Sequence, residues 1–101
     1  MIITIISPIR FKREIMEKYV ELSLKGYIVL LPVDTTTIYS KQTTTTENVL
    51  MKLHKEKIML ADMILVLNVN GYMGRGTYEE IGYAIVHGKK IEYLEPLKEV
   101  E

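Results

Sequence analysis

Short apolar runs recur along the chain at intervals that leave room for a helix between them. Residues 2–6, 27–31 and 63–67 are rich in β-branched and other apolar side chains, and residues 91–94 supply a further run. Strands that are apolar along almost their whole length are buried on both faces, which is typical of a parallel sheet with helices on either side. The pattern therefore predicts parallel strands that alternate with helices.

Helical periodicity fills the three intervals between these runs. Helices are expected over residues 11–25, 47–60 and 77–87, and a glycine follows the first and the last of them. Thr44 and Glu47 have the spacing of a capping box at the start of the second helix. The expected fold class is three-layer α/β, a four-stranded parallel sheet with helices on both faces and a flavodoxin- or Rossmann-like architecture.

Composition narrows the class of protein. With 101 residues the chain is long enough for a single domain, spanning 1–101, around one core. Its 13 basic and 13 acidic residues balance, so neither a nucleic-acid polymer nor a membrane is an expected partner. The lack of cysteine excludes disulfides and thiolate metal sites, and no metal or cofactor is expected. No apolar run approaches the ~20 residues of a membrane span and no signal-peptide pattern opens the chain, so a soluble cytoplasmic protein is expected.

The connection after the third apolar run combines glycines with an acidic helix start. Gly71, Gly74 and Gly76 precede a helix whose early residues include Glu80. A strand that passes through glycines into a helix N-terminus gathers backbone N–H groups and the positive end of the helix dipole, so a carboxylate held there stays ionised and could act as a nucleophile. Thr77 and Glu80 also have the spacing of a capping box, in which they would only close the helix start. Both interpretations of Glu80 are open at this point.

Ligands of open parallel sheets bind beyond the carboxyl ends of the strands, near the point where the strand order reverses. Three connections should meet there: residues 7–10, the threonine-rich residues 33–46, and residues 68–77. They carry groups that bind sugars or phosphates, and Arg10 suits a phosphate unless it is a solvated cation beside its basic neighbours. The candidate ligand-binding residues are Ser7, Arg10, Asn68, Gly71, Gly74 and Thr77.

Three short motifs stand out in the C-terminal half: Ala61-Asp62, Gly71-Tyr72-x-Gly74, and Glu80-Ile81-Gly82-Tyr83-Ala84. In type and spacing they resemble the nucleoside 2-deoxyribosyltransferase superfamily, which includes the deoxynucleoside 5′-monophosphate N-glycosidases. The resemblance places Glu80 on the catalytic nucleophile of that family. It implies cleavage or transfer of the N-glycosidic bond of a nucleoside or a nucleoside 5′-monophosphate.

The chain departs from the family at several positions. His54 stands where the characterised enzymes carry an aspartate, and its apolar neighbours on the same helix face make it either a proton-transferring residue or a buried structural one. Gly74 stands where the transferases have an acid. Pro8 stands where the monophosphate glycosidases have a serine, although Arg10 matches their phosphate-side arginine. Asp62, at the end of the sheet away from the crevice, is expected to be structural.

Three kinds of function fit these sequence motifs: an enzyme, a ligand-binding domain and an interaction domain. In the enzymatic one, Glu80 attacks the anomeric carbon as in a retaining glycosidase and His54 moves the proton of the leaving base. The alternative is a non-catalytic nucleotide-binding or sensor domain with the same fold, and a third is an interaction domain in which Glu80 only caps a helix. The expected partner in the first two is a nucleoside or nucleotide.

A symmetric homodimer is the expected assembly. Tyr72, Tyr78 and Tyr83 cluster around the glycine-rich connection and the last helix, and tyrosine is favoured at protein interfaces. The enzymes that the chain resembles are dimers or larger. Packing through the second and third helices is therefore expected, unless these tyrosines line the pocket of a monomer.

Overall fold

The computed structural model describes residues 1–33 and 44–97, and of residues 44–47 it describes the backbone only. Its strands are β1 (Ile2–Ile6), β2 (Ile28–Leu30), β3 (Met63–Val66) and β4 (Lys90–Tyr93), and its α-helices are α1 (Lys12–Leu24), α3 (Thr44–Leu60) and α4 (Arg75–Val86). Short 3-10 helices, η1 (Ile9–Phe11) and η2 (Val69–Gly71), follow β1 and β3. No helix of these two ranges is long and apolar enough to cross a bilayer.

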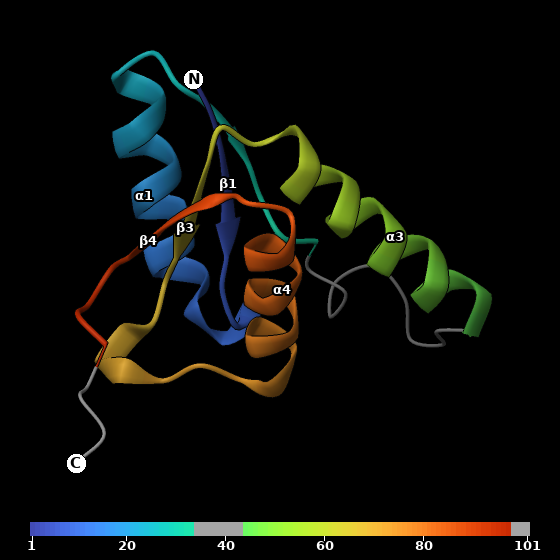
Figure 1. The fold of residues 1–101 in the computed structure, drawn as a ribbon. Coiled ribbons are helices and arrows are strands. Elements are labelled where there is room, and N and C mark those ends of the chain that lie inside the picture. Colours follow the sequence, from blue (N-terminus) through green and yellow to red (C-terminus); the bar gives the residue numbers. More distant parts are fainter. Residues whose placement is uncertain (34–43, 98–101) are drawn as a thin grey trace.

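The strands form one parallel sheet in the order β2-β1-β3-β4. Helix α1 covers one face, and α3 and α4 cover the other (Figure 1). This arrangement confirms the predicted three-layer α/β fold. The strand order reverses at β1, so the chain leaves the carboxyl ends of β1 and β3 in different directions and a ligand crevice is expected between them.

Side-chain alternation along the strands divides the core into two layers. Ile3 of β1 points to α1 and packs with Leu22, whereas Ile6 points to the opposite face. There Ile6 packs with Ile58 of α3 and Ile81 of α4. Both helices of that face are therefore fixed to the sheet by fully or almost fully buried side chains, each of which contributes about 1.5–3 kcal/mol.

Polar contacts hold the C-terminal half of α3 against the sheet. The Thr4 hydroxyl donates to the Lys57 carbonyl at 2.7 Å, and the Lys57 ammonium donates to the Leu31 carbonyl at 2.7 Å. Burial of that ammonium lowers the pKa of Lys57. At the end of the helix, the Lys89 ammonium donates to the Ala61 carbonyl at 2.9 Å. The N-terminal half of α3 projects beyond the sheet (Figure 1).

Asp62 closes the end of the sheet that lies opposite the crevice. Its carboxylate accepts the Ile2 N–H at 2.7 Å, and its own N–H donates to the Ile2 carbonyl at 2.8 Å. These bonds join the starts of β1 and β3. The predicted structural role of Asp62 is confirmed.

Two helices begin earlier than predicted. Helix α4 begins at Arg75 rather than at Thr77, with Gly74 as an extended N-cap (φ −74°, ψ 169°) that makes no side-chain capping bond. Thr77 lies inside the first turn and is buried, so the capping box of Thr77 and Glu80 is wrong. The glycine-rich connection already lets the backbone turn into a helix at Gly74, and a threonine cap is not needed. Helix α3 begins at Thr44 rather than at Glu47, and the side chains of its possible capping box lie outside the described residues.

Candidate active site

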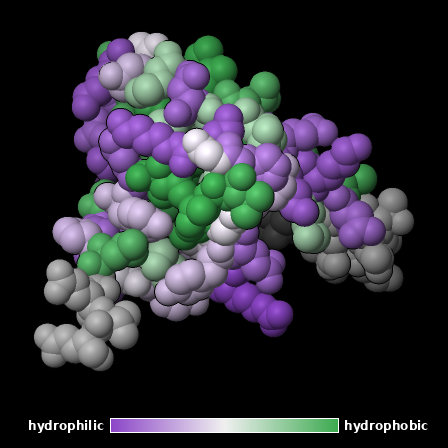
Figure 2. Space-filling view, in the orientation of Figure 1, coloured by the Kyte–Doolittle hydropathy of each residue, from purple (hydrophilic) through white to green (hydrophobic). Residues whose placement is uncertain are grey.

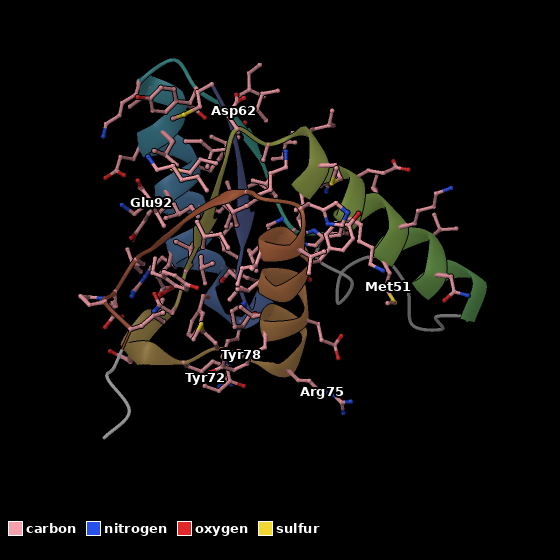
Figure 3. The ribbon with its side chains drawn as sticks, in the orientation of Figure 1. Met51, Asp62, Tyr72, Arg75, Tyr78 and Glu92 are labelled. Carbon is pink, nitrogen blue, oxygen red and sulfur yellow. The ribbon has the colours of Figure 1, made fainter. Side chains whose placement is uncertain are left out.

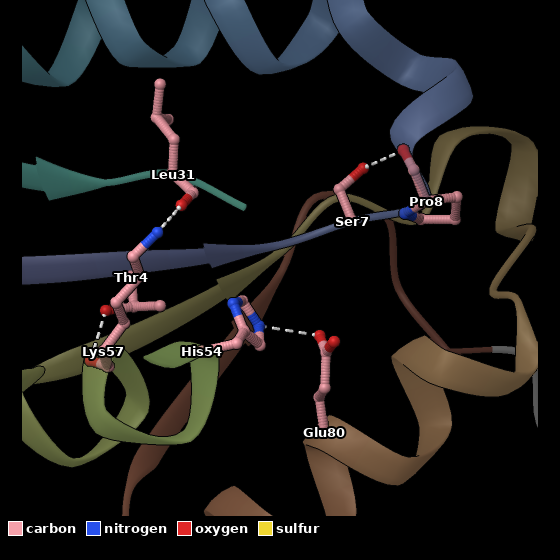
Figure 4. A network of polar contacts seen from close by, with 7 residues as sticks. All are labelled: Thr4, Ser7, Pro8, Leu31, His54, Lys57 and Glu80. Atoms are coloured by element: carbon pink, nitrogen blue, oxygen red, sulfur yellow. Dashed lines mark hydrogen bonds and ion pairs between the residues drawn. The ribbon is translucent and has the colours of Figure 1, made fainter. Parts of the chain in front are cut away.

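Glu80 and His54 face each other across the α3–α4 contact. His54 Nε2 lies 2.9 Å from Glu80 Oε2, and the two side chains are 11% and 34% exposed (Figure 4). His54 is one helical turn from Ile58, whose complete burial fixes that face of α3 on the sheet. Glu80 is one residue before Ile81, which anchors α4 in the same core layer. Packing of both helices on the sheet therefore sets the distance between imidazole and carboxylate.

The imidazole has an unsatisfied atom that points to the carboxylate. His54 Nε2 is buried, and no group among the described residues forms a hydrogen bond of suitable angle with it. The contact with Glu80 is therefore an approach at ion-pair distance rather than an aligned hydrogen bond. Buried polar atoms are nearly always bonded in proteins, so such an atom marks either a strained pair or a position that a ligand or water completes.

Two small hollows meet at the Glu80 carboxylate. The first, which we call the β1-side hollow, has a volume of about 230 Å³ and is lined by Ser7, Ile9, Pro32, Val33, Leu50, Met51, His54 and Glu80. The second, the inter-helix hollow, has a volume of about 200 Å³ and is lined by Met51, His54, Lys55, Ile58, Gly76, Glu79, Glu80 and Tyr83. Because both are lined by Met51, His54 and Glu80, they adjoin at these side chains. The carboxylate can therefore reach a ligand that extends from one hollow into the other.

Of the predicted binding residues, Ser7 lies beside the pair. It follows β1, is buried, and donates its hydroxyl to the Pro8 carbonyl at 3.0 Å (Figure 4). A hydroxyl can donate to one group and still accept from another, so Ser7 retains acceptor capacity towards a ligand. The structure thus brings together Ser7, His54 and Glu80.

Asn68 and Gly71 lie at a different cavity. This β3–β4 cavity has a volume of about 420 Å³ and is lined by Asn68, Gly71, Met73, Tyr78, Ile81, Tyr93, Pro96 and Leu97. The Asn68 amide donates to the Glu95 carbonyl and accepts the Glu95 N–H, both at 2.9 Å. Asn68 is only 1% exposed, so its side chain ties the end of β3 to the chain after β4.

The other three predicted residues line neither hollow at Glu80. Arg10 places its guanidinium carbon 3.7 Å from the centre of the Tyr72 ring, and Phe11 meets the same ring edge-on at 6.0 Å. Gly74 adjoins this cluster, since a Cβ there would lie 3.8 Å from the Tyr72 hydroxyl. Thr77 is 5% exposed within α4.

Sequence reasoning did not assign Met51 or Lys55 to the site, and it gave Tyr83 a place in a pocket only as the alternative to a dimer interface. The Lys55 ammonium lies 5.4 Å from the centre of the Tyr83 ring, and both side chains line the inter-helix hollow. Met51 and Lys55 share a helix face with His54, and Tyr83 is one turn after Glu80. That helical spacing was a usable signal once His54 and Glu80 had been singled out.

Within residues 1–33 and 44–97, no group of three or more histidine, cysteine, aspartate or glutamate side chains could hold a metal ion. Glu79, next to Glu80, is exposed and pairs with Arg75 at 3.5 Å. The chemistry of the site therefore centres on one carboxylate and one imidazole.

No protein-family model and no curated protein sequence matches the chain. Among solved structures, a 2-deoxyribosyltransferase from the psychrotolerant bacterium Bacillus psychrosaccharolyticus has a TM-score of 0.78 and 19% sequence identity, with 100% of this chain and 77% of that chain covered. At this identity the likeness shows a shared fold. The fold is thus similar to that of the class of protein that the sequence motifs resemble.

Proposed function

We propose that the chain cleaves or transfers the N-glycosidic bond of a nucleoside or a nucleoside 5′-monophosphate, with Glu80 as the nucleophile. The observation that carries this proposal is the pairing of Glu80 with His54, 2.9 Å apart, where two hollows meet. The similarity of the fold to a 2-deoxyribosyltransferase supports the same class of reaction. Because Glu80 does not cap α4, a capping role no longer competes with a catalytic one.

The reaction has two steps of retaining glycosidase chemistry. A Glu80 carboxylate oxygen forms a bond to the anomeric carbon while the bond from that carbon to the base nitrogen breaks, and the base leaves with the bonding electrons and a proton from His54. Water or a second base then displaces the carboxylate from the sugar, and His54 takes up the proton released. Hydrolysis and transfer differ only in which molecule enters at this second step.

Of the remaining predicted residues, two are candidates for contact with the ligand and four shape the backbone around the site. Ser7 is the candidate for a sugar hydroxyl, and its position in the lining of the β1-side hollow with Glu80 supports this role. Arg10, held over Tyr72, is the candidate for a 5′-phosphate. Asn68, Gly71, Gly74 and Thr77 shape the connection that leads into α4 rather than contact the reacting atoms.

The second candidate function is a nucleotide-binding or sensor domain without turnover. It is favoured by the pair itself, because the contact with His54 at 2.9 Å occupies a carboxylate oxygen that would have to attack the sugar. In this case the hollows bind a nucleoside, and the contact between His54 and Glu80 changes when the nucleoside is bound. The two functions share the pocket and differ only in whether the glycosidic bond breaks.

A panel experiment separates them. The full chain is incubated with nucleosides and their 5′-monophosphates, free base is detected by chromatography, and binding is measured by calorimetry on the same panel. Release of base from at least one compound supports the enzyme. Binding without base release supports the sensor, and a chain that neither binds nor releases base contradicts both.

We also propose a homodimer as the working assembly. Tyr72 and Tyr78, two of the tyrosines that suggested an interface, are 44% and 58% exposed. Tyrosine buries a large ring and keeps a polar tip, so exposed tyrosines of this kind are favoured at protein interfaces.

A further inference from the structure

The outer edge of β4 has no strand beside it in the described part of the chain. In that part β4 pairs with β3, and Leu94, just past β4, donates its N–H to the Val66 carbonyl of β3 at 2.8 Å. Successive residues of a strand direct their backbone groups to opposite edges, so the N–H and C=O groups of Ile91 and Tyr93 point away from the sheet. Such an edge can pair with another strand.

Two opposite charges alternate on this edge strand. Lys90 and Glu92 lie 3.5 Å apart, with side chains 70% and 53% exposed. Suppose a second copy pairs antiparallel about a twofold axis at Ile91. The outward backbone groups of the two Ile91 residues then bond to each other, and each Lys90 lies opposite Glu92 of the partner subunit. An axis one residue later would set two Glu92 carboxylates against each other. The edge is therefore complementary to itself in one register.

Helix α4 continues this surface with apolar side chains. Tyr78, Gly82 and Ile85 share one face of α4 by their spacing, and Tyr78 and Ile85 are 58% and 61% exposed. Tyr78 lines the β3–β4 cavity with Tyr93, which places this face on the side of β4. A Cβ at Gly82 would meet no heavy atom within 4 Å, so a partner helix has room to approach. In Figure 2 hydrophobic surface gathers where β4 meets the C-terminal part of α4, at which Val86 is 80% exposed.

We propose that β4 and this face of α4 form a symmetric interface with a second copy of the chain. The two four-stranded sheets then join edge to edge into one, and the α4 helices pack on each other. The sequence placed the interface on the second and third helices; this proposal keeps α4 and replaces α3 by β4. Figure 3 shows the two ends of the surface, with Glu92 on β4 and Tyr78 on α4. The hollows at Glu80 open on the α3 side of α4, so the interface does not depend on the proposed function.

A charge exchange tests the register. By light scattering and sedimentation, the full chain should have twice its 11.7 kDa mass. Glu92→Lys sets lysine against lysine twice and should raise the dimer dissociation constant by about tenfold or more. Combining it with Lys90→Glu restores both opposite-charge pairs and should bring the constant back to within about threefold of the parent. Thermal melts of each variant check that the monomer fold is kept. A monomeric parent chain, or a double variant as weak as the single one, overturns the proposal.

A second pair of variants distinguishes the two helices. Ile85→Glu places a charge on the proposed interface, and Val49→Glu is its matched control on the projecting half of α3; both side chains are exposed, so neither change should unfold the chain. Ile85→Glu should dissociate the dimer and Val49→Glu should not. The reverse result assigns the interface to α3 and overturns the proposal. Base release by the panel assay is independent of either outcome.

Discussion

The two sides of helix α4 carry cavities of opposite character. On the side of α3, the buried His54 Nε2 has no aligned hydrogen-bond partner among the described residues and points at the Glu80 carboxylate. On the side of β4, the larger β3–β4 cavity is lined by Asn68, whose amide is bonded twice to the main chain of Glu95. Satisfied polar groups hold a fold together, whereas unsatisfied ones are available to a ligand. The smaller hollows are therefore the better candidate for chemistry.

The largest expected difference between the two sides of α4 is the effect of replacing Glu80. Glu80→Gln removes the nucleophilic oxygen charge while keeping the side-chain shape, so base release should fall by at least about 10³-fold. Since Glu80 does not cap α4, the melting temperature should change little, in contrast to the loss of about 0.5–2 kcal/mol that removal of a cap would cause. Chromatography for free base and a thermal melt measure both effects.

Glu56→Gln is the matched control, because Glu56 is an exposed glutamate of α3 that lines neither hollow at Glu80. It should leave both base release and stability unchanged. A Glu80→Gln variant that releases base at the parent rate would show that Glu80 is not the nucleophile.

His54 should have the next largest effect. His54→Gln keeps a polar group near the Nε2 position but cannot transfer a proton near neutral pH, so kcat should fall by about 10²-fold with a smaller change in KM. The pH dependence of kcat should also flatten. His54→Asp, which introduces the residue of the resembling enzymes, should retain more activity than His54→Gln. If kcat and its pH profile survive in His54→Gln, the histidine is structural.

On the other side of α4, the expected effect is on stability. Asn68→Ala leaves the Glu95 N–H and carbonyl without their partner, which should lower the free energy of unfolding by about 1–3 kcal/mol. The kcat for base release should remain within about threefold of the parent. Urea unfolding measures the first effect, and exposed Asn48 on α3 offers a control substitution, Asn48→Ala, expected within about 0.5 kcal/mol. Lost turnover with unchanged stability would instead make Asn68 a ligand-binding residue.

The fold could be predicted because it depends on local pattern. Apolar runs marked the strands to within one residue, as in β4, predicted at 91–94 and found at Lys90–Tyr93. The start of α4 was less predictable, since a threonine with a glutamate three residues later is a valid cap and only the glycine loop geometry decides against it. Gly71, at φ 77°, takes the left-handed conformation that turns this connection, whereas Gly74 is extended, which any residue can adopt.

The site could be predicted only in part, because it depends on the packing of two helices. Glu80 was singled out from the glycine-rich connection and the family resemblance, and His54 from the resemblance. Helix spacing then groups Met51 and Lys55 with His54, but no local pattern says that α3 lies against Glu80. Asn68 was grouped with Glu80 because both follow β3. The bond of Asn68 to Glu95, 27 residues later in the chain, is a long-range contact that separates them.

Arg10 lies between the two sides of α4, and its replacement should have the smallest effect on activity. It follows β1 next to Ile9, which lines the β1-side hollow, while its guanidinium stacks on Tyr72 from the connection that leads to α4. Arg10→Ala should raise KM for 5′-monophosphates by about tenfold and leave nucleosides unchanged, because only the former offer a phosphate to the guanidinium. Arg13→Ala, which removes an exposed cation on α1, is the matched control and should change neither. Equal loss for nucleosides and monophosphates would mean that Arg10 acts through its contact with Tyr72 on the loop and not through a phosphate.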